Sequence, residues 1–468
     1  MNPAVRCPRP TPLWAILCVL LSGCVSYVPK DLNPATSAAG FDARSLADPQ
    51  LATFIGRHGL KPKGEWDLDR LTLAALYFSP ELAIARAELA GATGDKNAAA
   101  EWPNPSFNFS PGYNADAGPG QTPWILGYTL TIPADLSGQR SHRLLAAEKR
   151  QEAARFRLAA AAWTARAAVR QTLSEMHAAE NSAKAWRALL PAISNARKAL
   201  ASQAAVGEVS RAEAAQVRLT LDRAELASRD ADRTRLNATS RLAETIGIPL
   251  AALNAQPLSF RALGSFGRPP RIDQARLWAA QHRADLLAAL SEYSATQAEL
   301  QAEISRQYPD LSIGPGYQLD QGEGKWSLGL DLSLPLFNRN GAAIAAAEAK
   351  RSAQAARFQG LQIKTLAEVE RAARAYASAV ADLSTLDRMD ADLALSAQHL
   401  TAQAKAGEIS ALEAARLLME QADAVVAAET ARQRAEQSLA ALESAVQRPL
   451  RLLESEPAEK PARLSKKK

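Results

Sequence analysis

Cysteine is almost absent from this 468-residue sequence, and all three cysteines fall within the first 24 residues. The rest of the chain therefore cannot form an internal disulfide. Histidine is equally scarce, and its five copies are scattered singly, without the spacing of zinc ligands. No phosphate-binding loop and no nucleophile elbow occurs. These absences argue against an enzyme, and we expect no catalytic residue, no cofactor and no metal site.

Aromatic residues are also few, at 6%, whereas alanine is abundant, which favours closely packed helices over a core of large side chains. Beyond the N-terminal region no segment approaches the roughly 18 apolar residues of a transmembrane helix, so any membrane span must come from strands. The net charge of +6 is modest. Its basic residues alternate with acidic ones along the predicted helices, which indicates a solvated helix face. No basic block with interleaved aromatics occurs, so we expect no nucleic-acid partner.

The N-terminus carries a targeting pattern. Arg6 and Arg9 precede an apolar run from Leu13 to Leu21 that is too short to span a membrane as a mature helix. The sequence Leu21-Ser22-Gly23-Cys24 follows and resembles a bacterial lipobox. This resemblance implies a signal peptide over 1–23 and lipidation of Cys24; the alternative is a plain signal peptide with a chance cysteine. Residues 24–65 are rich in Pro, Gly and Ala, and we expect an extended, lipid-anchored segment.

Two stretches alternate strictly between apolar and polar residues. From Trp326 to Leu334 every even position is large and apolar, and the same pattern runs from Trp124 to Ile132. Each stretch follows another alternating run that ends in Pro-Gly-Tyr, which predicts two hairpins, at 105–133 and 309–335. The aromatics Trp124, Tyr128, Tyr317 and Trp326 are expected to face lipid or the interfacial girdles, or alternatively to pack against helices. The opposite face, expected to meet water, carries Asn108, Ser110, Thr129, Thr131, Ser312, Gln318, Asp331 and Ser333.

Almost all the remaining sequence has a helical pattern, so the predicted fold class is mainly α with a small β part. Helices are predicted at 66–101, 137–206, 208–246, 271–307, 341–406 and 408–446, with a linker at 248–270 and a tail at 447–468. A helix of 70 residues is roughly 100 Å long. Two short helices placed end to end would match one long helix, so side-by-side packing would give a tube of even length.

The same order of elements occurs twice, in the repeats 66–247 and 271–446. The strongest evidence lies where each long helix breaks: Gly207-Glu208-Val209-Ser210 is matched by Gly407-Glu408-Ile409-Ser410, 200 residues later. Glycine permits the positive φ that a tight reversal needs. Ser210 with Glu213 predicts a capping box that opens the returning helix. We therefore expect an internal duplication.

These features together resemble a TolC-like outer membrane factor. The resemblance rests on the duplicated element order, the two Gly-Glu-[Val/Ile]-Ser turns and the lipobox. The run from Leu334 to Gly341 is similar to the cobalt-zinc-cadmium efflux subgroup. Four strands with open edges cannot span a bilayer alone, but copies from several chains can close a barrel. The family implies that the assembly is a homotrimer. It implies a twelve-stranded barrel in outer-membrane lipid that continues into a periplasmic α-helical barrel. The implied function is the channel component of a tripartite, RND-type efflux system exporting small solutes, with heavy-metal ions as the first expectation.

The resemblance also implies partners and sites. A periplasmic adaptor and an inner-membrane pump are expected, with the adaptor docking on Gly207, Glu208, Val209, Ser210, Gly407, Glu408, Ile409 and Ser410. Family members often carry a carboxylate nine residues after the turn glycine, but Gln216 and Arg416 stand there in this chain. Glu213, Glu413 and Arg416 therefore remain candidates for an entrance constriction. A periplasmic adaptor or a coiled-coil envelope lipoprotein is the alternative reading. The sequence leaves the exported substrate open.

Overall fold

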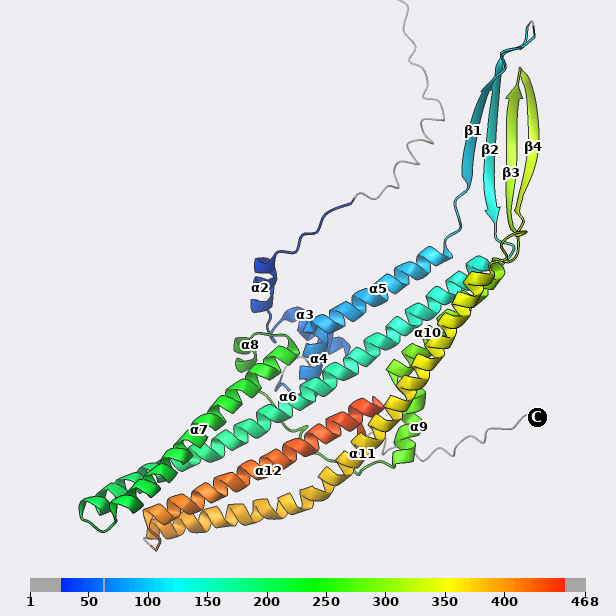
Figure 1. Cartoon of the computed structure of the whole chain (residues 1–468). Coiled ribbons are helices and arrows are strands. Elements are labelled where there is room, and N and C mark those ends of the chain that lie inside the picture. Colours follow the sequence, from blue (N-terminus) through cyan, green and yellow to red (C-terminus); the bar gives the residue numbers. More distant parts are fainter. Residues whose placement is uncertain (1–26, 62–63, 119, 407, 451–468) are drawn as a thin grey trace, which may run out of the picture. The chain divides into compact units, whose positions relative to one another are not determined.

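The computed structural model describes residues 27–61, 64–118, 120–406 and 408–450 (Figure 1). The predicted signal peptide, Cys24 and Gly407 lie outside these residues, as does the tail beyond residue 450. The chain divides into two units, residues 1–44 and 45–468. Within the first unit the structure describes one helix, α2 (Pro34–Asp42). All the other helices and strands described below belong to the second unit.

The prediction of an extended segment over 24–65 is wrong, because this stretch holds two short helices, α2 and α3 (Pro49–Arg57). Each begins with a proline, which suits the first position of a helix because its missing N–H needs no partner there. The side chain of Asn33 accepts hydrogen bonds from two backbone N–H groups of α2, and Asp48 caps α3 in the same way. Leu51 and Ile55 of α3, one turn apart, are buried.

The first half of the body contains α4 (Leu68–Phe78), α5 (Pro80–Ala100), β1 (Ser106–Tyr113), β2 (Trp124–Ala134), α6 (Gln139–Ala205) and α7 (Arg211–Ile246). The predicted single helix over 66–101 is wrong. It is broken at Ser79, whose backbone is extended and whose hydroxyl accepts the N–H of Leu82, because Pro80 cannot continue a helix. Trp66 lies before α4 and forms a parallel bridge with Leu258.

The second half contains α9 (Ile272–His282), α10 (Ala284–Ser305), β3 (Asp310–Asp320), β4 (Glu323–Ser333), α11 (Gly341–Ala406) and α12 (Ala411–Val446). The predicted helix over 271–307 is likewise two helices, separated by an extended Arg283. The long helices α6 and α11 have 67 and 66 residues, and α7 and α12 have 36 each. The two halves therefore match in element order and in helix length.

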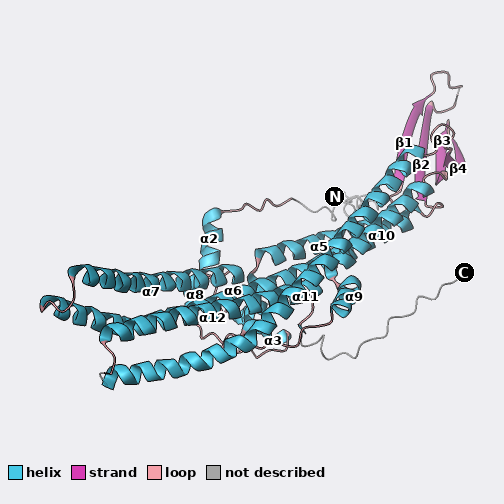
Figure 2. Ribbon diagram, turned by 60° about the horizontal axis from the view of Figure 1, so that its bottom comes forward, coloured by secondary structure: helices cyan, strands magenta, loops and turns pink. Residues whose placement is uncertain are grey.

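Helix α6 is the centre of the packing. It contacts α5, α7, α10 and α12, whereas α11 contacts α9, α10 and α12 (Figure 2). Three apolar clusters lie between these helices. One joins α3 and α4 to α6 and α7, a second joins α9, α11 and α12, and a third joins α6 and α7 to α12. Many of their buried members are alanines, which lets helix backbones approach closely, as the composition predicts.

Two segments that the sequence predicts to be loops are packed into this body. The linker 248–270 contains the short helix α8 (Leu250–Asn254), and Ile248 and Leu253 are buried in the first cluster. The start of the predicted tail is also ordered, since Leu450 is 3% exposed within the second cluster. The expectation of a tail from residue 447 is therefore wrong for its first four residues. Within the described parts of the chain, no helix is both long enough and apolar enough to cross a membrane.

Candidate functional sites in the sheet, the helix turns and a buried ion network

The four strands form one antiparallel sheet in the order β1-β2-β3-β4. Its register places one aromatic residue of each strand in a single row across the sheet: Phe109 opposite Tyr128, Tyr128 opposite Tyr317, and Tyr317 opposite Trp326. Directly opposed residues point to the same face. The ring centroids of Phe109 and Tyr128 lie 5.2 Å apart, and those of Tyr317 and Trp326 lie 4.9 Å apart. Pairing of strands from both halves therefore continues one aromatic face across the whole sheet.

The opposite face is small and polar. Its rows bring together Asn108 with Thr129, and Ser312 with Asp331. Glycines on this face leave space for neighbouring hydroxyls: a Cβ atom at Gly316 would lie 2.7 Å from Oγ of Ser327, too close for a real contact. The predicted division into an apolar and a polar face therefore holds across all four strands.

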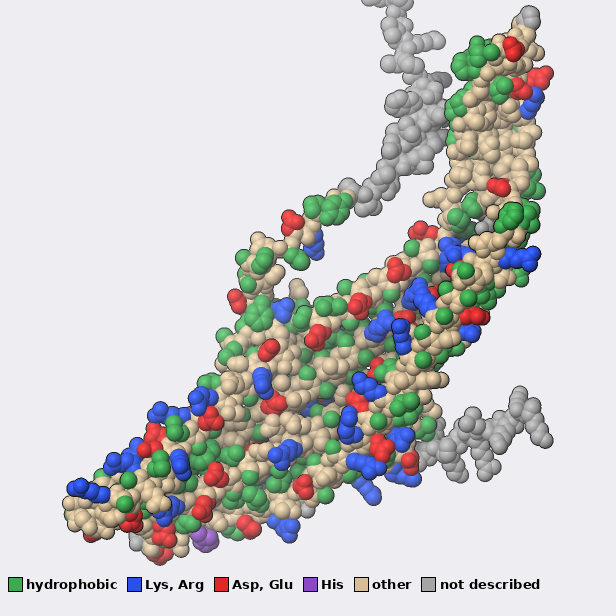
Figure 3. Space-filling model, in the orientation of Figure 1, with side chains coloured by type: hydrophobic (Ala, Val, Ile, Leu, Met, Phe, Trp, Pro, Cys, Tyr) green, Lys and Arg blue, Asp and Glu red, His purple; other side chains and the backbone are tan. Residues whose placement is uncertain are grey.

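The apolar face is uncovered. Trp326 is 84% exposed, and Leu328 and Leu330 are 68% and 67% exposed. Packing of the sheet aromatics against helices, the alternative considered from the sequence, is therefore wrong; they contact one another instead. Charged side chains are dense over the helices and sparse over the sheet (Figure 3). Within the residues that the structure describes, β1 and β4 each pair with a strand on one side only, so both edges of the sheet are open.

The helices that return after the two long helices begin with the same serine cap. Gly207 has a φ of 79°, the left-handed conformation that a reversal requires. The N–H of Glu213 donates to Oγ of Ser210 at 3.2 Å, and the N–H of Glu413 donates to Oγ of Ser410 at 3.1 Å. These bonds form the capping half of the predicted box, so α7 begins at Arg211 rather than at residue 208.

The exposure of the turn residues differs from the expectation in one respect. Glu208 and Glu408 are exposed, but Val209 and Ile409 are half-buried. Val209 precedes the cap and packs against the third cluster, which contains Ala214, as in a hydrophobic staple. Val206, outside the predicted set, is 71% exposed. The three candidates for the entrance constriction are all exposed, in the first two turns of α7 and α12: Glu213, Glu413 and Arg416.

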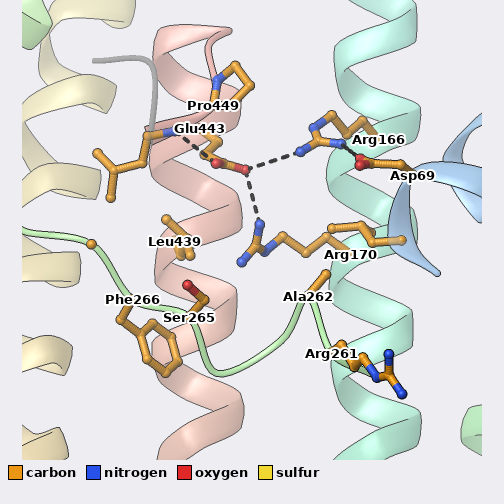
Figure 4. A pocket seen from close by; sticks show the side chains of 13 residues that line it. Asp69, Arg166, Arg170, Arg261, Ala262, Ser265, Phe266, Leu439, Glu443 and Pro449 are labelled. Carbon is orange, nitrogen blue, oxygen red and sulfur yellow. Dashed lines mark hydrogen bonds and ion pairs between the residues drawn. The ribbon is translucent and has the colours of Figure 1, made fainter. Parts of the chain in front are cut away.

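A buried ion network joins the two halves of the chain (Figure 4). Arg170 of α6 is 6% exposed, and its guanidinium lies 3.0 Å from a carboxylate oxygen of Glu436 and 3.3 Å from one of Glu443, both on α12. Arg166, one turn earlier, pairs with Asp69 of α4 at 3.1 Å. Asp69, Arg166, Arg170 and Glu443 line a cavity of about 350 Å³. The interpretation of helix charges as a solvated face is wrong here, since both glutamates are buried.

The same glutamates hold the connecting segments. The N–H of Gly264, in the linker, donates to Glu436 at 2.6 Å, and the N–H of Leu450 donates to Glu443 at 2.9 Å. Glu429 continues the series at the same interval of seven residues, and it is hydrogen-bonded to Asn181 of α6. Burial raises the pKa of Glu429 and lowers the pKa of nearby His177. The seven-residue spacing was the sequence signal that could have revealed this interface.

Among the residues that the structure describes, no group of three or more histidine, cysteine, aspartate or glutamate side chains could hold a metal ion. The two features that the structure presents are the exposed apolar face of the sheet, which suits an apolar environment, and the two turns with serine caps. A family model described as "outer membrane efflux protein" matches residues 73–248 and 278–445, which is most of the body.

The chain belongs to the outer membrane efflux protein family. The two matched segments correspond to the two halves of the body, each from its first helices to the end of its returning helix. An efflux protein has a transport role, which agrees with the prediction that the chain is not an enzyme. The same description fits the expected class of outer membrane efflux channels.

Two curated relatives are metal-resistance proteins. The chain is 28% identical to the cobalt-zinc-cadmium resistance protein CzcC of Cupriavidus metallidurans over 215 residues, which cover 45% of this chain and 50% of CzcC. It is also 28% identical to the nickel-cobalt-cadmium resistance protein NccC of Alcaligenes xylosoxydans xylosoxydans, over 67% of this chain and 69% of NccC. The match thus spans half the length of the first relative. Among solved structures, the outer-membrane channel OprN is similar, with a TM-score of 0.65 at 17% identity, covering 90% of this chain and 98% of OprN.

Proposed function

We propose that this efflux-family protein is the outer-membrane channel of a tripartite, RND-type efflux system. The observation that carries the proposal is the four-stranded sheet with one uncovered apolar face, one small polar face and two open edges. An apolar face is stable toward lipid, and a polar face is stable toward a water-filled lumen. Open edges would leave backbone groups without partners in lipid, so the edges must pair with other strands.

Pairing between copies satisfies this requirement. Three copies would contribute twelve strands, an even number within the range of outer-membrane barrels. The helices of three copies would then surround a periplasmic tunnel that continues the barrel. The matched lengths of α6 and α11, and of α7 and α12, support a tube of even length built from an internal duplication. The equivalent serine caps on α7 and α12 support the duplication further.

The partners are proposed from the turns. Glu208 and Glu408 are exposed beside two capped reversals at the ends of the long helices. These turns are the docking surface that we propose for a periplasmic adaptor, which links the channel to an inner-membrane pump. Glu213, Glu413 and Arg416 lie just after these turns, on the returning helices α7 and α12, and are proposed to line the entrance. Because CzcC and NccC are named for metal resistance, heavy-metal ions such as cobalt, zinc and cadmium are the proposed cargo.

Cys24 is proposed to be the lipidated N-terminus of the mature protein, on the basis of the sequence Leu21-Ser22-Gly23-Cys24. Intact-mass measurement of the protein purified from membranes tests this proposal. A mature chain that begins at Cys24 and carries the added mass of acyl groups is expected. A different first residue, or a mass equal to that of the bare polypeptide, would rule out the anchor while leaving the channel intact.

The function is tested in two steps. The purified protein should be a trimer by native mass spectrometry and should conduct ions in planar bilayers; a monomer without conductance would contradict the channel. Deleting its gene should then lower the cobalt, zinc or cadmium concentration that stops growth, and the intact gene should restore it. If tolerance to metals is unchanged while tolerance to organic compounds falls, the channel stands and the proposed cargo is wrong.

A further inference from the structure

A polar contact joins α6 to α12 beside the linker. The imidazole of His177 is half-buried on α6, and its ring stacks on Phe260 of the linker with 4.4 Å between the ring centroids. Its Nε2 lies 3.4 Å from Nδ2 of Asn181, one turn further along α6. Asn181 is in turn hydrogen-bonded to Glu429 of α12. One amide therefore connects an imidazole of the first half to a carboxylate of the second half.

The direction of these hydrogen bonds follows from the chemistry of the amide. Nδ2 is the only donor of an asparagine side chain, and an ionised carboxylate can only accept. The hydrogen bond from Asn181 lowers the pKa of Glu429, as a donor to a carboxylate does. Nδ2 therefore donates one hydrogen to Glu429 and has the other for Nε2 of His177, which must carry a lone pair. The contact requires a neutral His177 and a charged Glu429.

Burial makes both of these charge states sensitive to pH. Glu429 is 8% exposed, and burial raises its pKa. Burial is also the main cause that lowers the pKa of His177. An exposed histidine takes up a proton at a higher pH than an exposed glutamate, and these two shifts narrow that difference. Acidification therefore reaches the imidazole and the carboxylate over a narrower pH interval than it would in water.

The surrounding charges decide what protonation does to the contact. The charged groups that act on His177 come from both helices: Glu180 and Lys184 of α6 and Arg432 of α12. The linker faces the imidazole with an uncharged ring. Arg432 also pairs with Glu429 at 2.8 Å. At neutral pH these charges cancel, whereas protonation of His177 and Glu429 raises the local charge from zero to +2. A charged imidazole on α6 is then repelled by the guanidinium on α12.

We propose that His177, Asn181 and Glu429 form a pH-dependent clasp that holds α12 against α6 at neutral pH and releases it in acid. A protonated His177 can only donate, so the amide of Asn181 turns and presents Oδ1 to it. The same oxygen then faces Glu429, which can meet it only by taking up a proton from solvent as well. The amide thereby couples the two proton uptakes, and the added positive charge separates the two helices. The clasp depends on the fold alone and goes beyond the proposed channel function.

Hydrogen exchange of the full-length protein at about pH 7.5 and about pH 5 tests the clasp. Local exchange is preferable to thermal unfolding, because in acid the lowered pKa of His177 costs global stability while the raised pKa of Glu429 restores some of it. After correction for the chemical exchange rate, we expect peptides around both residues to lose protection in acid. His177→Phe keeps a ring against Phe260 but binds no proton, so its protection should not change. The control His142→Phe, elsewhere on α6, should respond as the parent does.

Infrared difference spectra test the coupling between the two protons. The band of a protonated carboxyl should appear in the acidified parent and be missing from Glu429→Gln. In His177→Phe the amide is not turned by an imidazolium, so the band should appear at a lower pH than in the parent. Loss of a nearby cation alone would act in the opposite direction, because it would favour protonation of the glutamate. The direction of this shift therefore separates a coupled clasp from two independent groups.

Three results would overturn the clasp. The first is an equal loss of protection in the parent and in His177→Phe. The second is a carboxyl band that stays in place or moves to a higher pH in His177→Phe. If His177→Phe does not fold, Glu429→Gln carries the test, because it can gain only one charge in acid and should lose less protection than the parent. An equal loss in Glu429→Gln and the parent is the third.

Discussion

The replacement Leu330→Arg tests the assignment of the sheet faces most directly. Leu330 is 67% exposed on the apolar face, with Leu328 and Leu332 on either side of it along β4. Removing a side chain that is so exposed leaves no cavity, so the variant loses little packing within one copy. Its effect must come from the environment of the face. An arginine near the midplane of the bilayer costs about 2–4 kcal/mol, which amounts to about 6–12 kcal/mol over three copies.

Ser333→Arg is the matched control. Ser333 lies three residues further along the same strand, opposite Asp310 on the polar face. The same arginine there would meet a water-filled lumen and a neighbouring carboxylate. The assay is the yield of heat-resistant trimer from outer membranes, measured on gels of unboiled samples. We expect trimer from Ser333→Arg and almost none from Leu330→Arg. Equal trimer from both variants would refute the face assignment, and loss of both would show that arginine disturbs the strand itself.

Three further predictions concern the helices. Gly207→Val should strain the turn by about 1–2 kcal/mol, because a valine must adopt the left-handed conformation there. We expect normal trimers, faster hydrogen exchange in the turn and lost crosslinking to an adaptor. Unchanged hydrogen exchange would count against this strain. Arg170→Met should destabilise the protein by about 3–5 kcal/mol, because it leaves Glu436 and Glu443 buried without their cation. Thermal unfolding measures this loss of stability. The control Arg187→Met removes an exposed ion pair with Asp232 and should lower the unfolding temperature far less. Glu429→Gln should stabilise the protein at pH 7, because burial raises the pKa of Glu429 in the folded state and the charged form is disfavoured there. That gain in stability should fade as the pH falls through the raised pKa toward the ordinary pKa of a glutamate, because the folded wild-type carboxyl is then protonated. A gain in stability that does not depend on pH would rule out burial of the charge as its cause.

Local sequence patterns were sufficient to predict the strands, the long helices and the serine caps. Alternation of apolar and polar residues predicted the two faces of the sheet, because side chains of a strand point alternately to its two sides. The serine caps at Ser210 and Ser410 were predictable because the residues that form them lie three positions apart in the chain. The breaks at Ser79 and Arg283 were missed. Ser79 precedes a proline, which is a local signal, but Arg283 is held by contacts with Glu368 and with the carbonyl of Ala445 that the sequence pattern does not show.

The sequence by itself determined the four strands, the two long helices and the turns after them, because each depends on residues close together in the chain. The tertiary structure alone decided which charges are buried and how the halves join. Arg170 meets Glu436 across 266 residues. The seven-residue spacing of the glutamates places them on one helix face, but it does not identify Arg170 as their partner. The tertiary structure likewise decided that Phe109, Tyr128, Tyr317 and Trp326 form one row, because register between strands of different halves is set by the pairing of whole strands.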